Sequence, residues 1–535
     1  MTADGRREKG TPATYVEIDR GLVAVNVLST VCTHLIGIGV LLWVNQYLLK
    51  RLSAEEYAIF PIVIALFLFL QVFTSVLTGG ISRYVTEAYA KADLRRVTEI
   101  VSSMFPLILV SVLGFWTLGG FFALNVGHLL RIEPEQVPYA QQMLGLMVFG
   151  HGIVLLAMPF SVGLHVRQKF IWLNLIKLGE QVLRLLLLMF FLFEVSTSVH
   201  WVVVSTQIAV LTAMGVTVLV SMRLIPELRF VRSAFRRATM RQLSSFGGWM
   251  MLGSLLYRIR NSADVIILNK LSTAVDVNAF HVGRLPDRQM DVLLTLVSIN
   301  MQPPLIAMHA ADREESLRRA YLRGNRYHLW ITLAVGVPLF VFAKELVILY
   351  AGETYLLAAI VLQLRCASYP FIYANHMLNL VCLAKARVRT FFLIVSAGAV
   401  VHLVTAYILA GEYGMGAAGV AFASFSVAVA IQLLFLWPMG LRILSLPFKR
   451  FVKETLVPGY VPTAGALAAG YGLRNALVPE SFLAVGLSVA GCLVVYVLLM
   501  AVFSAPEDRK DVLILFRHIR GRFRPKSAPR LGSAG

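Results

Sequence analysis

Three charged side chains lie inside an apolar segment of the sequence, residues 246–270, which is long enough to cross a lipid bilayer. Arg258, Arg260 and Asp264 fall in its middle and its second half. At about 100° per residue they share one helical face, and aliphatic side chains occupy the opposite face. An ionisable group at membrane depth costs roughly 2.5–3.5 kcal/mol, so such a face normally looks into a helix bundle or a water-filled cavity. The segment is therefore predicted to form the wall of a pathway.

A second apolar segment, centred near residue 182, has a similar polar face. Lys177, Glu180 and Arg184 share this face at helical spacing. Glu180 lies three residues after Lys177 and four before Arg184, so an internal ion pair is one interpretation of the pattern. Lys177, near one end of the span, has the alternative of extending its amine to the membrane surface. Arg184 lies deeper, which makes it a candidate for ligand binding.

Weaker polar patterns mark three other spans. Asn26 and Thr30 in the first span fit either a cavity wall or close helix packing. Asp291 belongs to a polar face in the eighth span, and Arg365 lies on one face with His376 in the tenth. The candidates for substrate binding are Arg258, Arg260, Arg184, Arg365, Lys177, Tyr257, Asn261, Asn26 and Thr30, and those for ion coupling are Glu180, Asp264 and Asp291.

The balance of these charges indicates the kind of ligand. Five bases lie inside predicted spans, against two carboxylates that are clearly at membrane depth, Glu180 and Asp264. If each carboxylate neutralises one base, about three positive charges remain to face something else. A phosphate or pyrophosphate group suits arginine in particular, because the guanidinium binds two oxygen atoms at once. An anionic ligand is therefore predicted.

Sequence signatures of catalysis are absent. The chain contains no GxxxxGK[ST], no HExxH and no GxSxG, and no predicted outer loop is long enough to fold into a catalytic domain. All four cysteines lie in apolar spans, without the spacing of a metal site or of a disulfide framework. We expect no catalytic residue, metal or cofactor, and a transporter or flippase rather than an NTPase or a hydrolase.

These residues must be positioned by membrane helices. Of the 535 residues, 58% are hydrophobic and only 15% are charged, which is the composition of a polytopic membrane protein. The hydrophobic segments predict an all-α chain of about 14 transmembrane helices. No cleavable signal peptide is expected, because the first 20 residues are polar.

The net charge of +20 is explained by the distribution of basic residues along these spans. Of 49 Lys and Arg residues, 36 lie in the two tails and the loops on their side, and eight lie in the opposite loops. This asymmetry places both termini in the cytoplasm. No nucleic-acid motif accompanies the charge, so no nucleic-acid partner is expected.

Two parts of the sequence correspond at a fixed offset. The segment LSAEEYAIF from Leu52 matches LSTAVDVNAF from Leu271, and Asp93 matches Asp312, each pair 219 residues apart. This shift covers six spans, so the two halves are predicted to share one orientation as a parallel pseudo-repeat. The expected segments are a cytoplasmic N-tail (1–21), an N-lobe of spans 1–6 (22–222), a basic cytoplasmic linker (223–242), a C-lobe of spans 7–12 (243–440), spans 13 and 14 (441–504) and a basic cytoplasmic tail (505–535).

The motifs LSAEEYAIF, GGISRYVTEAYAKAD followed by LRR, and FGGWMMLGSLLYRIRNSADVIILNKLSTAVDVNAF also carry a family resemblance. They resemble the polysaccharide transporter family of O-antigen and exopolysaccharide flippases, within the superfamily of multidrug extruders and lipid II flippases. The resemblance implies two six-helix lobes around a central cavity and alternating access. It implies a substrate of isoprenoid pyrophosphate-linked oligosaccharide, moved from the cytoplasmic to the outer leaflet for surface polysaccharide assembly.

Two alternatives stay open on the sequence. A multidrug cation extruder of the same superfamily would require acidic residues in its cavity, and a polytopic glycan ligase or polymerase would require a sizeable outer loop. The expected partners are the lipid-linked oligosaccharide, membrane lipids and polysaccharide polymerase machinery. The chain is expected to be a monomer in the inner cell membrane.

Overall fold

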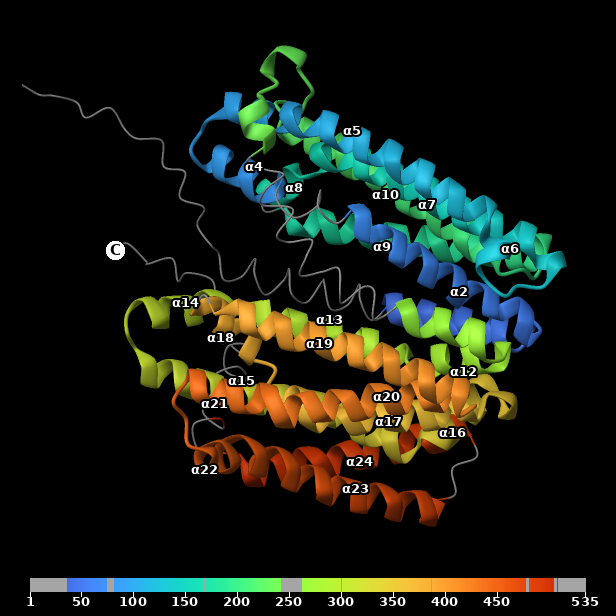
Figure 1. Ribbon diagram of the computed structural model, residues 1–535, viewed down its shortest axis with the longest axis vertical. Coiled ribbons are helices and arrows are strands. Elements are labelled where there is room, and N and C mark those ends of the chain that lie inside the picture. Colours follow the sequence, from blue (N-terminus) through green and yellow to red (C-terminus); the bar gives the residue numbers. More distant parts are fainter. Residues whose placement is uncertain are drawn as a thin grey trace, which may run out of the picture. The chain divides into compact units, whose positions relative to one another are not determined.

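The computed structural model describes residues 36–74, 81–167, 169–241, 262–299, 301–385, 387–477 and 481–504, together with Asp508. Every regular element in these ranges is a helix (Figure 1). The prediction of an all-α membrane fold is therefore confirmed for the described part of the chain.

The chain divides into two compact units. Unit 1 comprises Met1–His281 and Leu403–Val420, and unit 2 comprises Val282–His402 and Ala421–Gly535. The predicted lobes have their boundary elsewhere, between residues 222 and 243. Those lobe limits stay a prediction.

Unit 1 is built on long helices that pack side by side. Helix α7 contacts α5, α10 and α2, and α10 also contacts α9. Its helices are Ile36–Leu49, α2 (Ala54–Leu70), α4 (Ile81–Ala90), α5 (Leu94–Leu124), α6 (Val126–Leu129), α7 (Val137–Ser161), α8 (Gly163–Val166), α9 (Phe170–Phe190), the π turn η3 (Phe191–Val195) and α10 (His200–Leu224).

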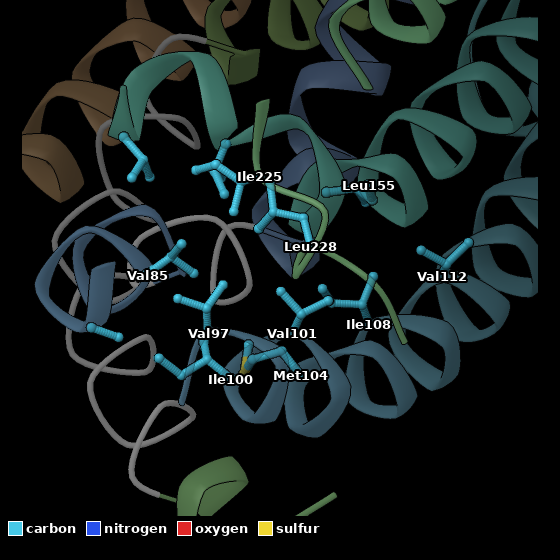
Figure 2. Close-up of a cluster of buried hydrophobic side chains, with 13 residues drawn as sticks. Val85, Val97, Ile100, Val101, Met104, Ile108, Val112, Leu155, Ile225 and Leu228 are labelled. Atoms are coloured by element: carbon cyan, nitrogen blue, oxygen red, sulfur yellow. The ribbon is translucent and has the colours of Figure 1, made fainter. Parts of the chain in front are cut away.

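A cluster of aliphatic side chains closes one end of unit 1 (Figure 2). Val85 of the amphipathic α4, Val97 and Val101 of α5, and Leu228 beyond α10 are fully buried in it. Helix α5 begins where Asp93 caps the backbone N–H of Arg96 at 3.0 Å. The cluster therefore joins the start of α5 to the segment that follows α10.

The basic segment after α10 folds back onto α5. Its backbone N–H groups at Val231 and Arg236 donate to the hydroxyls of Ser102 and Ser103, at 2.9 and 3.0 Å. Both serines are fully buried. These hydrogen bonds hold part of the segment that was predicted from the sequence as a basic cytoplasmic linker against α5.

Unit 2 is arranged around α15, which packs against α17, α23 and α24. Its elements are α13 (Leu285–Ile299), α14 (Gln302–Ala310), α15 (Glu314–Val341), α16 (Ala343–Ala351), α17 (Leu357–Tyr373), α18 (Leu378–Ala384), η7 (Gln432–Leu436), α21 (Trp437–Ile443), α22 (Phe448–Phe451), η8 (Val452–Leu456), α23 (Val457–Leu477) and α24 (Phe482–Phe503). Three helices, α12 (Ala274–Gly283), α19 (Val388–Tyr407) and α20 (Gly416–Ile431), run across the division between the units.

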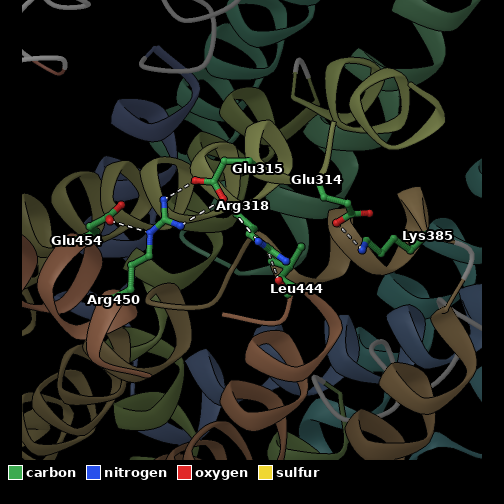
Figure 3. Close-up of polar contacts among 7 residues, drawn as sticks. All are labelled: Glu314, Glu315, Arg318, Lys385, Leu444, Arg450 and Glu454. Atoms are coloured by element: carbon green, nitrogen blue, oxygen red, sulfur yellow. Dashed lines mark hydrogen bonds and ion pairs between the residues drawn. The ribbon is translucent and has the colours of Figure 1, made fainter. Parts of the chain in front are cut away.

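Ion pairs join three connections of unit 2 at one end (Figure 3). Arg450 Nη2 binds Glu315 Oε1 of α15 at 2.8 Å, and its Nε binds Glu454 Oε1, also at 2.8 Å. Lys385, just after α18, binds Glu314 at 2.8 Å. The connections that carry these residues are all predicted on the cytoplasmic side, so their contacts agree with helices that alternate in direction.

Two local features recur in both halves of the chain. Helix α5 begins at Leu94 and α15 at Glu314, each directly after a turn that contains a residue of positive φ, Ala92 and Asp312. Helix α9 continues into the π turn η3, and α19 continues into the π turn η6 (Ile408–Glu412). The axis that would relate the two halves in space remains a prediction.

Seven helical segments within the described ranges are long and apolar enough to cross a membrane, or eight if α15 and α16, bent by 72°, form one span. Helix α9 does not pass this test, since it carries Lys177, Glu180 and Arg184. The predicted first and seventh spans extend outside the described residues. The structure thus supports a multi-pass membrane protein, while the number 14 is not established.

Candidate functional site

The polar face of α9 is the best-described part of the predicted cavity. Lys177 is exposed, whereas Glu180 and Arg184 are half-buried. Arg184 Nη2 donates a hydrogen bond to Gln181 Oε1. A Cβ atom at Gly37 would lie 3.7 Å from Gln181 Cδ, so the helix Ile36–Leu49 comes close to this face.

The opposite face of α9 is apolar and open. Leu175, Val182 and Leu186 are all more than 40% exposed. An isolated apolar face of this kind suits lipid rather than water. The half-buried Glu180 and Arg184 therefore lie on the side of α9 opposite this apolar face, whereas Lys177 is exposed.

Most of the predicted residues of the seventh span lie outside the described part of the chain. Asp264 is described, and it is 3% exposed in the short helical segment that ends at Leu271. A buried carboxylate of this kind requires a partner. The substrate-binding candidates outside the described residues are Arg258, Arg260, Tyr257, Asn261, Asn26 and Thr30.

Arg365 has a partner that the sequence did not reveal. Its Nε binds Asp287 Oδ2 at 2.6 Å, and Tyr369 donates its hydroxyl to Asp287 Oδ1 at 2.8 Å. Arg284 Nε lies 3.9 Å from the same carboxylate. Two bases and one acid thus meet between α13 and α17. No local pattern signals this, because Asp287 and Arg365 are 78 residues apart.

Asp291 lies one turn further along α13, on an exposed position. The hydroxyl of Thr295 donates to the backbone carbonyl of Asp291 at 2.7 Å. Ser298 continues along the helix and contacts His328 of α15. The polar face predicted for this span is therefore present, and its last member makes a contact inside the unit.

A buried polar cluster in unit 2 was missed by the sequence analysis. Tyr321 donates its hydroxyl to Asn375 Oδ1, and Asn325 Oδ1 accepts from the backbone N–H of Met377 at 2.8 Å. The rings of His328 and His376 have centroids 4.7 Å apart. His376, predicted from the sequence to share a face with Arg365, thus belongs to a group of polar side chains.

This cluster surrounds a break in the predicted tenth span. Helix α17 ends at Tyr373 and α18 begins at Leu378, which frees backbone groups inside an apolar segment. Trp437 Nε1 donates to the carbonyl of Phe371 at 3.1 Å, and Tyr460 donates to that of Pro370 at 2.9 Å. Side chains of other helices therefore satisfy the broken helix, as an apolar environment requires.

Comparison with known proteins agrees with this architecture. The family model described as "Polysaccharide biosynthesis protein" matches residues 23–300. No curated protein matches the chain. The structure is similar to the lipid II flippase MurJ in an inward closed conformation, with a TM-score of 0.67 and 14% identity, over 90% of this chain and 98% of that one.

Multidrug transporters share the same fold. An inward-facing MATE-family transporter of the MOP superfamily aligns with a TM-score of 0.62 and 16% identity, over 77% of this chain and 95% of that one. A MOP superfamily transporter from Pyrococcus furiosus, described as having a binding pocket of reverse polarity, aligns with a TM-score of 0.56 and 15% identity, over 79% of this chain and 96% of that one. The chain therefore belongs to the polysaccharide biosynthesis protein family, and it has the fold of the MOP superfamily of flippases and transporters.

Proposed function

We propose that the protein is a flippase that moves an isoprenoid pyrophosphate-linked oligosaccharide from the cytoplasmic to the outer leaflet. Membership of a polysaccharide biosynthesis family supports a role in making a polysaccharide. The fold shared with a lipid II flippase supports movement of a lipid-linked substrate across the membrane. The substrate would cross by alternating access around a cationic cavity. The protein would work in the inner cell membrane, with both of its termini in the cytoplasm.

The charge of α9 is the observation that carries this proposal. Helix α9 carries two bases, Lys177 and Arg184, against one carboxylate, Glu180, and both Arg184 and Glu180 are half-buried. A pyrophosphate matches this excess, since arginine binds two phosphate oxygens at once. Under this proposal Arg184 contacts the headgroup, together with Arg258 and Arg260 of the seventh span. Arg365 would contribute to the same positive field with its partner Asp287.

Export of a cationic drug is the second candidate function, because multidrug transporters have the same fold. A cation would call for an excess of carboxylates on cavity faces. On α9 the balance is the reverse. The charge of this helix thus favours an anionic substrate.

Substitution of Arg184 tests the proposal. In cells that lack their own flippase, Arg184→Ala should reduce surface polysaccharide at least tenfold at normal membrane abundance, and Arg184→Lys should restore it only in part. The matched control is Arg223→Ala, an exposed base at the end of α10. Full activity of Arg184→Ala, together with export of cationic dyes, would support the drug-exporter function instead.

A further inference from the structure

A pair of histidines lies in unit 2, and neither was predicted as a substrate-binding residue. His328 of α15 is 1% exposed, and its ring centroid lies 4.7 Å from that of His376 in the turn between α17 and α18. The ring of Tyr373 has its centroid 5.6 Å from that of His376 and is tilted against it by 56°. Polar residues inside a membrane protein's apolar segments are rare and normally have a function, so this pair of imidazoles calls for one.

The hydrogen bonds of His328 define its protonation state. Nδ1 lies 2.6 Å from the backbone carbonyl of Gly324, and a carbonyl oxygen only accepts, so Nδ1 carries a hydrogen. Nε2 lies 3.0 Å from the hydroxyl of Ser298 on α13. In the neutral ring, Nε2 accepts from Ser298. When a proton from water binds Nε2, this N–H donates and the serine oxygen becomes the acceptor. The site thus holds either state without losing a hydrogen bond.

The surroundings limit the pair to one proton. Two imidazolium rings at this separation would repel each other strongly. Other titratable or charged side chains on these and neighbouring helices include Asp291 on α13, His309 on α14, Tyr321, Arg323 and Arg326 on α15, Tyr369 and Tyr373 on α17, Cys382 on α18, Arg442 on α21 and Tyr460 on α23.

Two arginines of this group pair with a carboxylate. Arg326 and Arg323 lie 2.6 and 3.7 Å from Asp508 Oδ1. Within the described part of the chain, no carboxylate contacts either imidazole. A bound proton therefore meets no negative charge in this conformation. Proton binding would favour a second conformation, in which water or an anion reaches the two rings.

We propose that His328 and His376 form a one-proton binding site that responds to the contact between α13 and α15. Ser298, which senses this proton, lies on the polar face of α13 that also carries Asp291, predicted from the sequence as an ion-coupling residue. This inference rests on the proposed function for its link to transport. Proton binding and an anionic headgroup in the cavity would then favour each other, since linkage between two sites is reciprocal.

Nuclear magnetic resonance of histidine ring nitrogens in the full-length protein, in lipid nanodiscs, tests the site directly. As the pH falls from about 6.5 to about 4, one ring should change from the Nδ1–H form to imidazolium, because burial without a counter-charge favours the neutral ring, and this signal should be lost in His328→Asn. Ser298→Ala should move the midpoint to lower pH, because hydrogen bonds to a charged donor are the stronger ones. A ring that keeps its neutral form across this range in the unmodified protein would overturn the proposal.

The link to the cavity is tested with farnesyl pyrophosphate as an anionic probe and farnesol as its uncharged control. The pyrophosphate should move the midpoint to higher pH, and farnesol should leave it unchanged. His151→Asn is the matched control, because His151 forms a similar contact with the hydroxyl of Thr74 at 3.2 Å in unit 1. A midpoint that does not respond to farnesyl pyrophosphate would refute the link and count against an anionic cavity, whereas the proton site itself would stand.

Discussion

At the scale of single residues, two deeply buried charges of unit 2 pair with each other. Arg326 is 4% exposed and Asp508 is 1% exposed, and Arg326 Nη2 binds Asp508 Oδ1 at 2.6 Å. Tyr327 donates its hydroxyl to the same oxygen at 2.9 Å, and Arg326 Nη1 donates to the carbonyl of Glu454 at 2.5 Å. The pair holds Asp508 against α15, and loss of either partner would leave a buried charge without compensation.

Asp508→Asn should therefore destabilise the protein. Breaking a buried ion pair costs about 3–5 kcal/mol, and thermal unfolding in detergent should show a clearly lowered midpoint. The double variant Arg326→Met/Asp508→Leu should recover most of this loss, because it removes both charges. Glu353→Gln, at an exposed position, serves as the control. An unchanged midpoint in Asp508→Asn would show that water reaches this pair.

Sequence reasoning was least successful for such residue contacts. It identified the polar face of α9 and the buried Asp264, because helical spacing predicts a shared face within one helix. It missed Asp287 as the partner of Arg365, and it missed His328 as the neighbour of His376. Both missed residues lie on other helices. Periodicity carries no information on which helices become neighbours, so contacts across 48 or more residues had no signal.

At the scale of elements, the prolines show how far a local sequence signal predicts where a helix ends. Pro159 lies near the end of α7, which stops two residues later at Ser161. Pro303 and Pro304 lie in the first turn of α14, which begins at Gln302 after the end of α13 at Ile299. Pro106 nevertheless lies inside the unbroken α5. Proline alone therefore does not predict a break, and the one after Tyr373 was not foreseen.

The break after α17 leaves little space beside α21. A Cβ atom at Gly440 would lie 2.6 Å from Tyr321 Oη and 3.2 Å from Asn375 Oδ1. Gly440→Ala should cost about 1–3 kcal/mol, because neither partner can move without losing its hydrogen bond. Gly472→Ala in α23 is the matched control, since nothing lies within 4 Å of its Cβ position. Thermal midpoints that fall equally in both variants would contradict the expected crowding at Gly440.

The ion pair between Glu314 and Lys385 predicts a pH dependence of unit 2. The hydrogen bond from Lys385 lowers the pKa of Glu314 below its ordinary value of 4.5. A lowered pKa in the folded state means that this pair stabilises the protein above about pH 4.5 and that the effect is lost as the pH falls through the folded value. The pair is partly exposed, so the effect is at most about 1 kcal/mol.

Glu314→Gln should accordingly unfold at a slightly lower temperature than the unmodified protein at neutral pH. The two midpoints should converge in acid, where Glu314 is protonated in both the folded and unfolded states. Glu133→Gln, in the short connection before α7, provides an exposed carboxylate for comparison. A difference between the midpoints that persists at acid pH would show that the amide perturbs the site by its shape.

At the scale of the whole molecule, composition predicted the class of protein. The hydrophobic content indicated the multi-pass helical fold, and the motifs near residues 52, 79 and 246 indicated a family that the match over residues 23–300 confirms. The number of spans and the limits of the lobes stay predictions, because seven or eight segments pass the length and polarity test within the described residues.

Reporter fusions test the predicted orientation. A phosphatase that is active only outside the cytoplasm should be inactive when fused after Arg241 or after Gly535, because 36 basic residues lie on that side. A fusion within the connection near Leu356, on the predicted outer side, provides the active control. Phosphatase activity after Arg241 or Gly535 would reverse the assignment of sides.

The pairing of Arg326 with Asp508 also sets an order of events during synthesis. The two residues are 182 positions apart, so the ribosome releases Arg326 long before its counter-charge exists. At roughly 5–20 residues per second, the newly made α15 must wait about 10–40 seconds for Asp508 to be translated. Until then the arginine depends on water or on the membrane insertion machinery. A chain that stops before Asp508 keeps this unmatched charge, so truncated products would remain recognisable to membrane proteases.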